Sequence, residues 1–241
     1  MSVYTPVERD ELEAFLLNYE LGELLDYQGI SAGIENTNYF VTTSDKPLVL
    51  TLFENHSAEE LGYFLDLMAF LAEHAVPSAH PIADRDGHYL RILNGKPAAL
   101  VMRLRGASIE QPNTAQCGAI GHALGQLHLS GQQFDGHRDN DRGPHWWHTT
   151  REAIADKLSD AELGLLDEEL AFQRDHRFDT IPRGVIHADL FRDNALFEGD
   201  TLTGFIDFYY ACNDVLLYDV AVTVNDWCST ADGSLDEEKL P

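Results

Sequence analysis

The sequence predicts an α+β fold of two lobes, in which an antiparallel β-sheet with one main helix is followed by a mostly helical C-terminal lobe. Three observations support this prediction. Strand-like runs separated by turn formers dominate residues 1–105, helical periodicity dominates residues 106–241, and a chain of 241 residues that is 44% hydrophobic can bury a core in each part. We therefore place the lobe boundary near residue 105.

The first helix is expected directly after a capping box at residues 5–8, with Pro6 at its first helical position. Leu12 and Phe15 follow at helical spacing, and Gly22 marks the end of the segment. Three strands are expected next, at residues 24–28, 38–43 and 48–53.

The main helix of this lobe is expected after Ser57, which forms a second capping box with Glu60. Two more strands, at residues 89–93 and 98–104, flank Asn94-Gly95, a strong hairpin signal. Together these elements predict a five-stranded antiparallel sheet.

The C-terminal lobe is expected to begin with a helix whose apolar stripe includes Ile120 and Leu127. A third capping box at residues 159–162 begins another helix, which runs toward Arg174. Residues 131–148 are polar and too long for a simple connector, so we expect a functional or mobile loop there.

Composition excludes several functional classes. Lys and Arg total 16 against 41 Asp and Glu, so the net charge of −25 argues against nucleic acid and against anionic membranes as partners. The three cysteines lack paired spacing, which is typical of reduced thiols, and residues 1–13 show no secretory signal. We expect a cytoplasmic protein that acts on small molecules, and the sequence leaves its oligomeric state open.

The strongest chemical signal is the spacing of three polar residues. Asp189 and Asn194 are five positions apart, and Asp207 follows a short predicted hairpin. The same spacing places a catalytic carboxylate and two Mg²⁺ ligands in kinases, where the carboxylate takes the proton of the acceptor hydroxyl. Each residue alone could be a solvated loop residue, but carboxylates placed beside apolar runs usually have a partner or a metal. His187 belongs to the same catalytic loop, and we favour a structural hydrogen-bonding role for it over proton transfer.

These motifs give the chain a family resemblance. It resembles the aminoglycoside phosphotransferase and choline kinase superfamily, and within it the bacterial homoserine kinases of threonine biosynthesis. The matching stretches are residues 33–40, 49–54, 121–128, 187–194 and 206–227. The resemblance implies a protein-kinase-like fold, ATP and Mg²⁺ as cofactors, and phosphorylation of the hydroxyl of L-homoserine to O-phosphohomoserine.

The resemblance also implies roles for individual residues. Asp189 would be the catalytic base, Asn194 and Asp207 would bind Mg²⁺, and Asp219 would brace the catalytic loop. ATP would bind under a loop over residues 29–38 and at the lobe junction around residues 102–105. The residues that we assign to ATP are Gly33, Asn36, Asn38, Thr51, Met102 and Leu104.

One position departs from the kinase pattern. Thr51 stands where kinases carry the lysine that contacts the α- and β-phosphates. Either another cation reaches the phosphates, the metal neutralises more of the charge, or catalysis is weakened. Glu60 could be the helix glutamate that pairs with that lysine, but capping already explains it and is the reading we prefer.

A zwitterionic acceptor needs a cation for its carboxylate and an anion for its ammonium group. The residues near the catalytic loop that could supply them are Arg192, Asp193, Asp214 and Asp226. Arg138 and Arg142, in the polar loop, are equally available.

Two alternatives stay open from the sequence. The acceptor could be choline or an aminoglycoside, since aromatic residues such as Tyr209 and Tyr210 could form a cage for a cation. The chain could also be a kinase-like module that binds nucleotide without transferring phosphate. Residues 232–241 resemble the start of a further helix, so we expect a C-terminal lobe that is shorter than is usual in the family.

Overall fold

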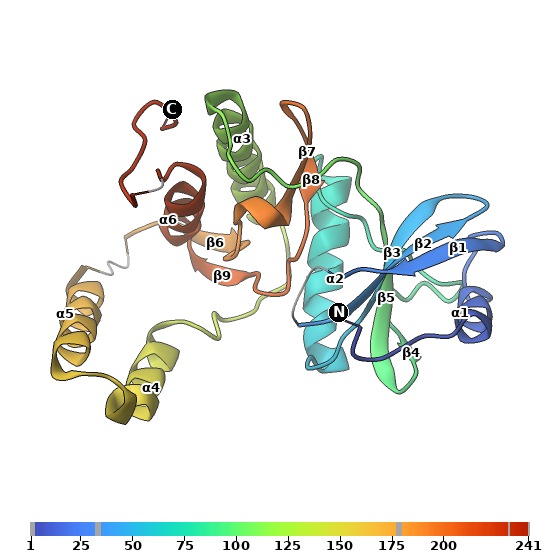
Figure 1. The fold of residues 1–241 in the computed structure, drawn as a ribbon, viewed down its shortest axis with the longest axis horizontal. Helices are drawn as coiled ribbons and strands as arrows, with labels where there is room; N and C mark the ends of the chain where they lie inside the picture. The colour runs from blue at the N-terminus through green and yellow to red at the C-terminus, as the bar shows by residue number, and fades with distance from the viewer. Residues whose placement is uncertain (1–2, 32–34, 177–179, 231, 241) are drawn as a thin grey trace.

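A five-stranded antiparallel sheet forms the N-terminal lobe in the computed structural model, which describes residues 3–31, 35–176, 180–230 and 232–240 (Figure 1). Its strands lie in the order β1-β2-β3-β5-β4. They are β1 (Leu24–Gly29), β2 (Thr37–Thr43), β3 (Pro47–Leu52), β4 (Arg91–Leu93) and β5 (Lys96–Met102). The antiparallel sheet and its hairpin at Asn94-Gly95 are as expected from the sequence, while the strand order is known only from the structure.

The two faces of the sheet have different partners because side chains alternate along each strand. Leu48, Leu50 and Leu52 of β3 point toward α1 (Arg9–Leu16) and are fully buried in one cluster with Phe15. Thr51 therefore points to the opposite face, toward the C-terminal lobe.

The first helix begins later than the sequence predicts. Its N-cap is Glu8, which forms a capping box with Glu11, so the predicted cap at residues 5–8 is wrong. The backbone N–H groups of Tyr4 and Thr5 donate instead to Oγ1 of Thr37. These bonds hold the segment extended against β2 and delay the start of the helix.

The C-terminal lobe combines helices with two small sheets. Its helices are α3 (Thr114–Gly131), α4 (Pro144–Ile154), η1 (Ala155–Lys157), α5 (Asp160–His176), η2 (Arg192–Asn194) and α6 (Leu216–Trp227). Its strands are β6 (Arg183–Ile186), β7 (Ala195–Glu198), β8 (Thr201–Phe205) and β9 (Cys212–Val215), and they pair as β6 with β9 and as β7 with β8. The expected loop over residues 131–148 is shorter, because Pro144 starts α4 at its first turn.

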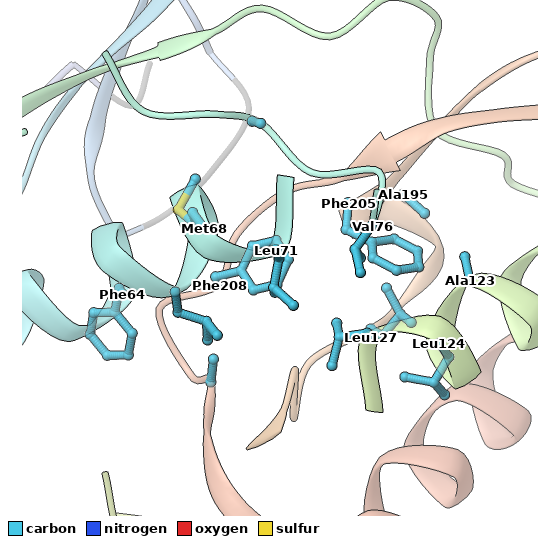
Figure 2. Packing of buried hydrophobic residues seen from close by; sticks show 14 of the residues in the cluster. Phe64, Met68, Leu71, Val76, Ala123, Leu124, Leu127, Ala195, Phe205 and Phe208 are labelled. Atoms are coloured by element: carbon cyan, nitrogen blue, oxygen red, sulfur yellow. The ribbon is translucent and has the colours of Figure 1, made fainter. Parts of the chain in front are cut away.

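One hydrophobic cluster joins the two lobes through α2 (Ala58–Glu73). Phe64, Met68 and Leu71 on this helix lie across from Leu127 of α3, with Phe205 between the helices (Figure 2). All of them are nearly inaccessible to solvent. Because α2 lies between β3 and β4 in the chain but packs against the second lobe, it links the sheet to that lobe.

The fold class expected from the sequence is confirmed, whereas a lobe boundary near residue 105 stays a prediction. None of the helices in the described part of the chain combines the length and apolar character needed to cross a membrane.

Candidate active site

Two short antiparallel ladders place the catalytic loop. The loop leaves β6 at His187 and enters β7 after Asn194, and Asp207 follows β8, the partner of β7. The backbone N–H of Ile206 donates to the carbonyl oxygen of Asn194 at 3.0 Å. The chain thereby brings Asn194 and Asp207 together although they are 13 positions apart.

Asp189 and Asn194 contact each other directly. Nδ2 of Asn194 donates to Oδ2 of Asp189 at 2.9 Å and to the carbonyl oxygen of Asp189 at 2.8 Å. The amide nitrogen is thus occupied, which leaves the amide oxygen as the atom with which Asn194 can bind a cation.

Two residues of the site adopt a left-handed backbone conformation that side chains rarely take. The φ angles are 66° at Ala188 and 62° at Asp207. Such conformations store local strain and persist where surrounding contacts hold them, often at active sites. One lies directly before Asp189, the expected base, and the other is Asp207, an expected metal ligand.

A buried carboxylate holds the catalytic loop in this conformation. Asp219 of α6 is fully buried and accepts hydrogen bonds from the backbone N–H groups of His187 and Ala188, each at 2.9 Å. It also lies 2.9 Å from Nε2 of His128 on α3. Sequence reasoning missed His128, and the available signal was a histidine on the apolar stripe of that helix, directly after Leu127.

His187 connects the loop to the segment that leads to Asp207. Its buried ring contacts Phe208 at a centroid distance of 4.5 Å, and Nε2 lies 3.0 Å from the carbonyl oxygen of Ile206. Burial lowers the pKa of His187, so the ring stays neutral and Nε2 donates to that carbonyl. This contact is the kind of hydrogen bond that we expected for His187, and its role in catalysis stays a prediction.

The site carries excess negative charge. Burial, reinforced by the carboxylates of Asp193 and Glu35, raises the pKa of Asp189 to about 6 against the hydrogen bond from Asn194. Burial and then the Asp189 carboxylate raise the pKa of Asp207 to about 6 as well. Repulsion among these carboxylates therefore acts on both residues. A divalent cation would relieve that repulsion, so these oxygen ligands fit Mg²⁺.

A cavity of about 320 Å³ opens beside the catalytic loop. Ala188 lines it next to Asp189, Tyr210 lines it from the segment after Asp207, and Glu60 lines it from α2. Arg138 and Arg142 line it from the loop before α4. This cavity is a candidate acceptor site, because its wall at Ala188 adjoins Asp189.

The acceptor residues expected near the catalytic loop do not line this cavity. The side chain of Arg192 is bound to Asp226, with Nε 3.0 Å from Oδ2, and the backbone N–H of Arg192 donates to the same oxygen. Asp214 is buried and contacts Arg183 and Asn140. We therefore withdraw Arg192, Asp214 and Asp226 as acceptor residues, because their partners within the fold already use them.

Asp193 is exposed, and its carboxylate acts electrostatically on Asp189 and Asp207 without lining the cavity. Its role in acceptor binding stays a prediction.

The residues assigned to ATP lie in two places, one on and just before strands β2 and β3 and the other at the lobe junction. Asn38 and Thr51 face each other across β2 and β3, where Oγ1 of Thr51 donates to Oδ1 of Asn38 at 2.7 Å on the face toward the C-terminal lobe. Asn36 is buried, and its Oδ1 accepts from the backbone N–H of Glu54 at 3.4 Å. Gly33 lies outside the described residues.

Met102 and Leu104, the two residues assigned to ATP at the lobe junction, have different surroundings. Met102 packs on the side of the sheet that faces α1, and its backbone N–H donates to the carbonyl of His80, so the structure turns it away from the cleft. Leu104 packs against the cluster shared by both lobes. Of the two, Leu104 alone remains a candidate for contact with the base of ATP.

Glu60 has the capping role that we preferred. Its Oε2 accepts from the backbone N–H of Ser57 at 2.9 Å, while Oε1 lies 3.3 Å from the Arg138 guanidinium. The glutamate of the main helix thus pairs with a cation from the C-terminal lobe.

Comparison with known proteins gives a consistent assignment. Residues 26–240 match the model of the phosphotransferase enzyme family. A homoserine kinase of Methylobacillus flagellatus is 52% identical over 242 residues, which cover 100% of this chain and 75% of that protein. A homoserine kinase of Methylobacillus glycogenes is 49% identical over 236 residues, covering 98% of this chain and 74% of that protein.

Solved structures agree on the fold. An amicoumacin kinase in complex with AMP-PNP, Ca²⁺ and amicoumacin aligns with a TM-score of 0.73 at 15% identity. The alignment covers 92% of this chain and 69% of that one. At this identity the likeness supports the two-lobed architecture alone.

Proposed function

The chain belongs to the phosphotransferase enzyme family and groups within it with the homoserine kinases, and from that premise we propose that it phosphorylates L-homoserine with ATP. The products are O-phosphohomoserine and ADP, in a step of threonine biosynthesis. The observation that best supports catalysis is the braced loop, in which Asp219 holds the backbone before Asp189 while Asn194 holds its carboxylate.

The reaction needs one proton acceptor at the hydroxyl. As the acceptor oxygen bonds to the γ-phosphorus, the bond from that phosphorus to the β–γ bridging oxygen breaks and the hydroxyl proton passes to Asp189. A pKa of about 6 lets Asp189 serve as a base near neutral pH. The contact from Asn194 Nδ2 aims its carboxylate.

We propose that Asn194 and Asp207 hold Mg²⁺ through oxygen atoms. When bound, the ion neutralises phosphate oxygens, which this acidic site cannot do with its carboxylates. The two left-handed residues Ala188 and Asp207 set the direction of the loop and of the second ligand before ATP arrives.

We also propose Thr51, Asn38, Asn36 and Leu104 as the described residues nearest to ATP. The first two lie on the sheet face that looks toward the catalytic loop. Since Thr51 supplies no charge, charge neutralisation at the phosphates depends more on the metal than in kinases with a lysine there.

We place the protein in the cytoplasm, with small molecules as its partners. All three cysteines, Cys117, Cys212 and Cys228, are free and buried, which suits a reducing compartment. A net charge of −25 disfavours nucleic acid and anionic lipid surfaces. We propose residues 1–105 and 106–241 as the nucleotide-binding and acceptor lobes.

A coupled assay of ADP release tests the activity. L-Homoserine, choline, an aminoglycoside and L-serine are compared with Mg-ATP, on the chain and on its Asp189→Asn variant. We expect turnover that depends on homoserine and that falls by at least about 100-fold in the variant, because the base is removed. Faster turnover with another acceptor would replace homoserine as the substrate.

A further inference from the structure

Arg142 is an arginine without a carboxylate partner in a strongly acidic chain. Other arginines contact a carboxylate within 4.0 Å, as Arg138 does with Glu60 and Arg192 with Asp226. In the described part of the chain, Arg103 is the one other arginine without a carboxylate within 4.0 Å. Its guanidinium lies over the ring of Phe40 in the N-terminal lobe. With 41 acidic residues available, a guanidinium left open in a cavity is suited to an anion from outside.

The guanidinium of Arg142 is held in place by neutral groups. Its Nη2 donates to the hydroxyl of Tyr210 at 2.9 Å, and that hydroxyl donates in turn to Oε1 of Glu35 at 2.6 Å. The guanidinium carbon lies 4.4 Å from the centroid of the Tyr210 ring and 5.8 Å from that of Trp146. The Tyr210 hydroxyl accepts from one N–H of Arg142, so other N–H groups of the planar guanidinium are available to a carboxylate.

Arg142 also lies within reach of the base. It lines the same cavity as Ala188, the neighbour of Asp189, and its charge lowers the pKa of Asp189 against the effect of burial. In an amino-acid alcohol the hydroxyl and the carboxylate are at opposite ends of one short molecule. A cavity whose wall at Ala188 adjoins the base and whose other wall carries an open guanidinium fits such a molecule.

Arg138 is the other cation of the cavity, and it is already neutralised. Its guanidinium contacts the carboxylates of Glu60 and Asp141 and lies over the ring of Phe64 at 5.0 Å. Of the two arginines, Arg142 is therefore the one whose charge is not neutralised by a contacting carboxylate.

We propose that Arg142 binds the carboxylate of the acceptor, with Tyr210 as the residue that positions it. This inference rests on the proposed homoserine kinase activity and names the acceptor as an amino acid with a free carboxylate. Choline offers no carboxylate and brings a positive charge toward Arg142, so this residue discriminates against it.

The test compares acceptors with and without the carboxylate. L-Homoserine and 3-amino-1-propanol share the hydroxyl and the amine, and 3-amino-1-propanol lacks the carboxylate. In Arg142→Gln we expect kcat/KM for homoserine to fall roughly 10- to 100-fold, the range for a lost charge-assisted hydrogen bond, while the KM for ATP and the response to 3-amino-1-propanol stay unchanged. Arg142→Lys should restore part of the loss. Arg174→Gln on α5, whose exposed cation pairs with its neighbour Asp175, is the matched control.

Tyr210→Phe tests the positioning role, because it removes the hydroxyl and keeps the ring. We expect the KM for homoserine to rise roughly 3- to 10-fold with kcat nearly unchanged. An unchanged KM in this variant would remove Tyr210 from the proposal.

Three results would overturn the role of Arg142. The first is an unchanged kcat/KM for homoserine in Arg142→Gln, and the second is an equal loss of kcat/KM for homoserine and 3-amino-1-propanol. The third is a rise in the KM for ATP without a rise in the KM for homoserine, which would assign the guanidinium to phosphate. Homoserine binding measured by calorimetry separates this inference from the proposed function. If the unchanged chain binds homoserine without turnover and Arg142→Gln does not bind it, the proposed activity fails and the carboxylate site stands. If both bind homoserine equally, the carboxylate site fails.

Discussion

Replacement of Asp219 by Ala should destabilise the protein and disable the catalytic loop together. The carboxylate is fully buried and has three contacts at 2.9 Å, to the backbone N–H groups of His187 and Ala188 and to Nε2 of His128. Each buried donor left without an acceptor costs about 1–3 kcal/mol, and partial entry of water lowers the sum. We expect a loss of about 3–5 kcal/mol in the free energy of unfolding, measured by urea denaturation at an unchanged m-value.

The conservative variant Asp219→Asn separates the two effects. Its amide oxygen can accept from only part of the donor set, so we expect a smaller loss of about 1.5–3 kcal/mol. We also expect a kcat lowered roughly 100-fold, because the loop that carries Asp189 shifts. Asp26→Ala, an exposed carboxylate on β1, should change stability by less than about 0.5 kcal/mol and serves as the control. A loss below about 1 kcal/mol in Asp219→Ala would refute the claim that this carboxylate holds the loop.

Three further predictions concern other parts of the molecule. Asp207→Asn should lower kcat about 100- to 1,000-fold, and asparagine suits the left-handed φ of 62° at this position. The melting temperature should stay the same or rise, because one of the mutually repelling charges is removed. A loss of kcat under tenfold contradicts the metal role. Gly106→Ala should destabilise by about 2–4 kcal/mol in urea denaturation, because φ is 89° and a Cβ would lie 2.2 Å from the carbonyl oxygen of Phe197. Gly118→Ala in α3 meets nothing within 4 Å and should instead stabilise by up to about 1 kcal/mol, so equal effects of the two would contradict this reasoning. Capping hydrogen bonds and an arginine hold the pKa of Glu60 at about 2. In acid titrations, the stability advantage of the unchanged protein over Glu60→Gln, below about 1 kcal/mol at this partly exposed site, should be full above pH 4.5 and vanish as the pH falls toward 2. An advantage that grows on acidification would contradict this prediction.

The hairpin that brings Asn194 and Asp207 together was predictable because it lies in a short stretch of chain. Asp189 and Asn194 are five residues apart, and a hairpin of fixed length returns the chain to Asp207. Spacing of this kind is a local property, so the sequence alone indicates which residues meet. The capping box at Ser57 was predictable for the same reason.

The residue that we propose for the acceptor carboxylate was not predictable, because its neighbours come from distant parts of the chain. Proximity in sequence to the catalytic loop suggested Arg192 and Asp226, yet the fold pairs these two with each other. Arg142 lies 47 positions before Asp189, and nothing in its local sequence separates it from Arg138. Only the burial of Arg138 against Glu60 and Asp141 shows which of the two arginines keeps a free charge.

The sequence by itself determined the strands of the N-terminal sheet, the start of α2 and the hairpin between Asn194 and Asp207, because periodicity, capping and motif spacing act over a few residues. The tertiary structure decided which charges are satisfied and which remain open. It set His128 and Asp219 behind the loop from two different helices, turned Met102 toward α1, and left Arg142 facing the cavity. Whether a charge is free depends on every element packed around it, and that is a property of the whole fold.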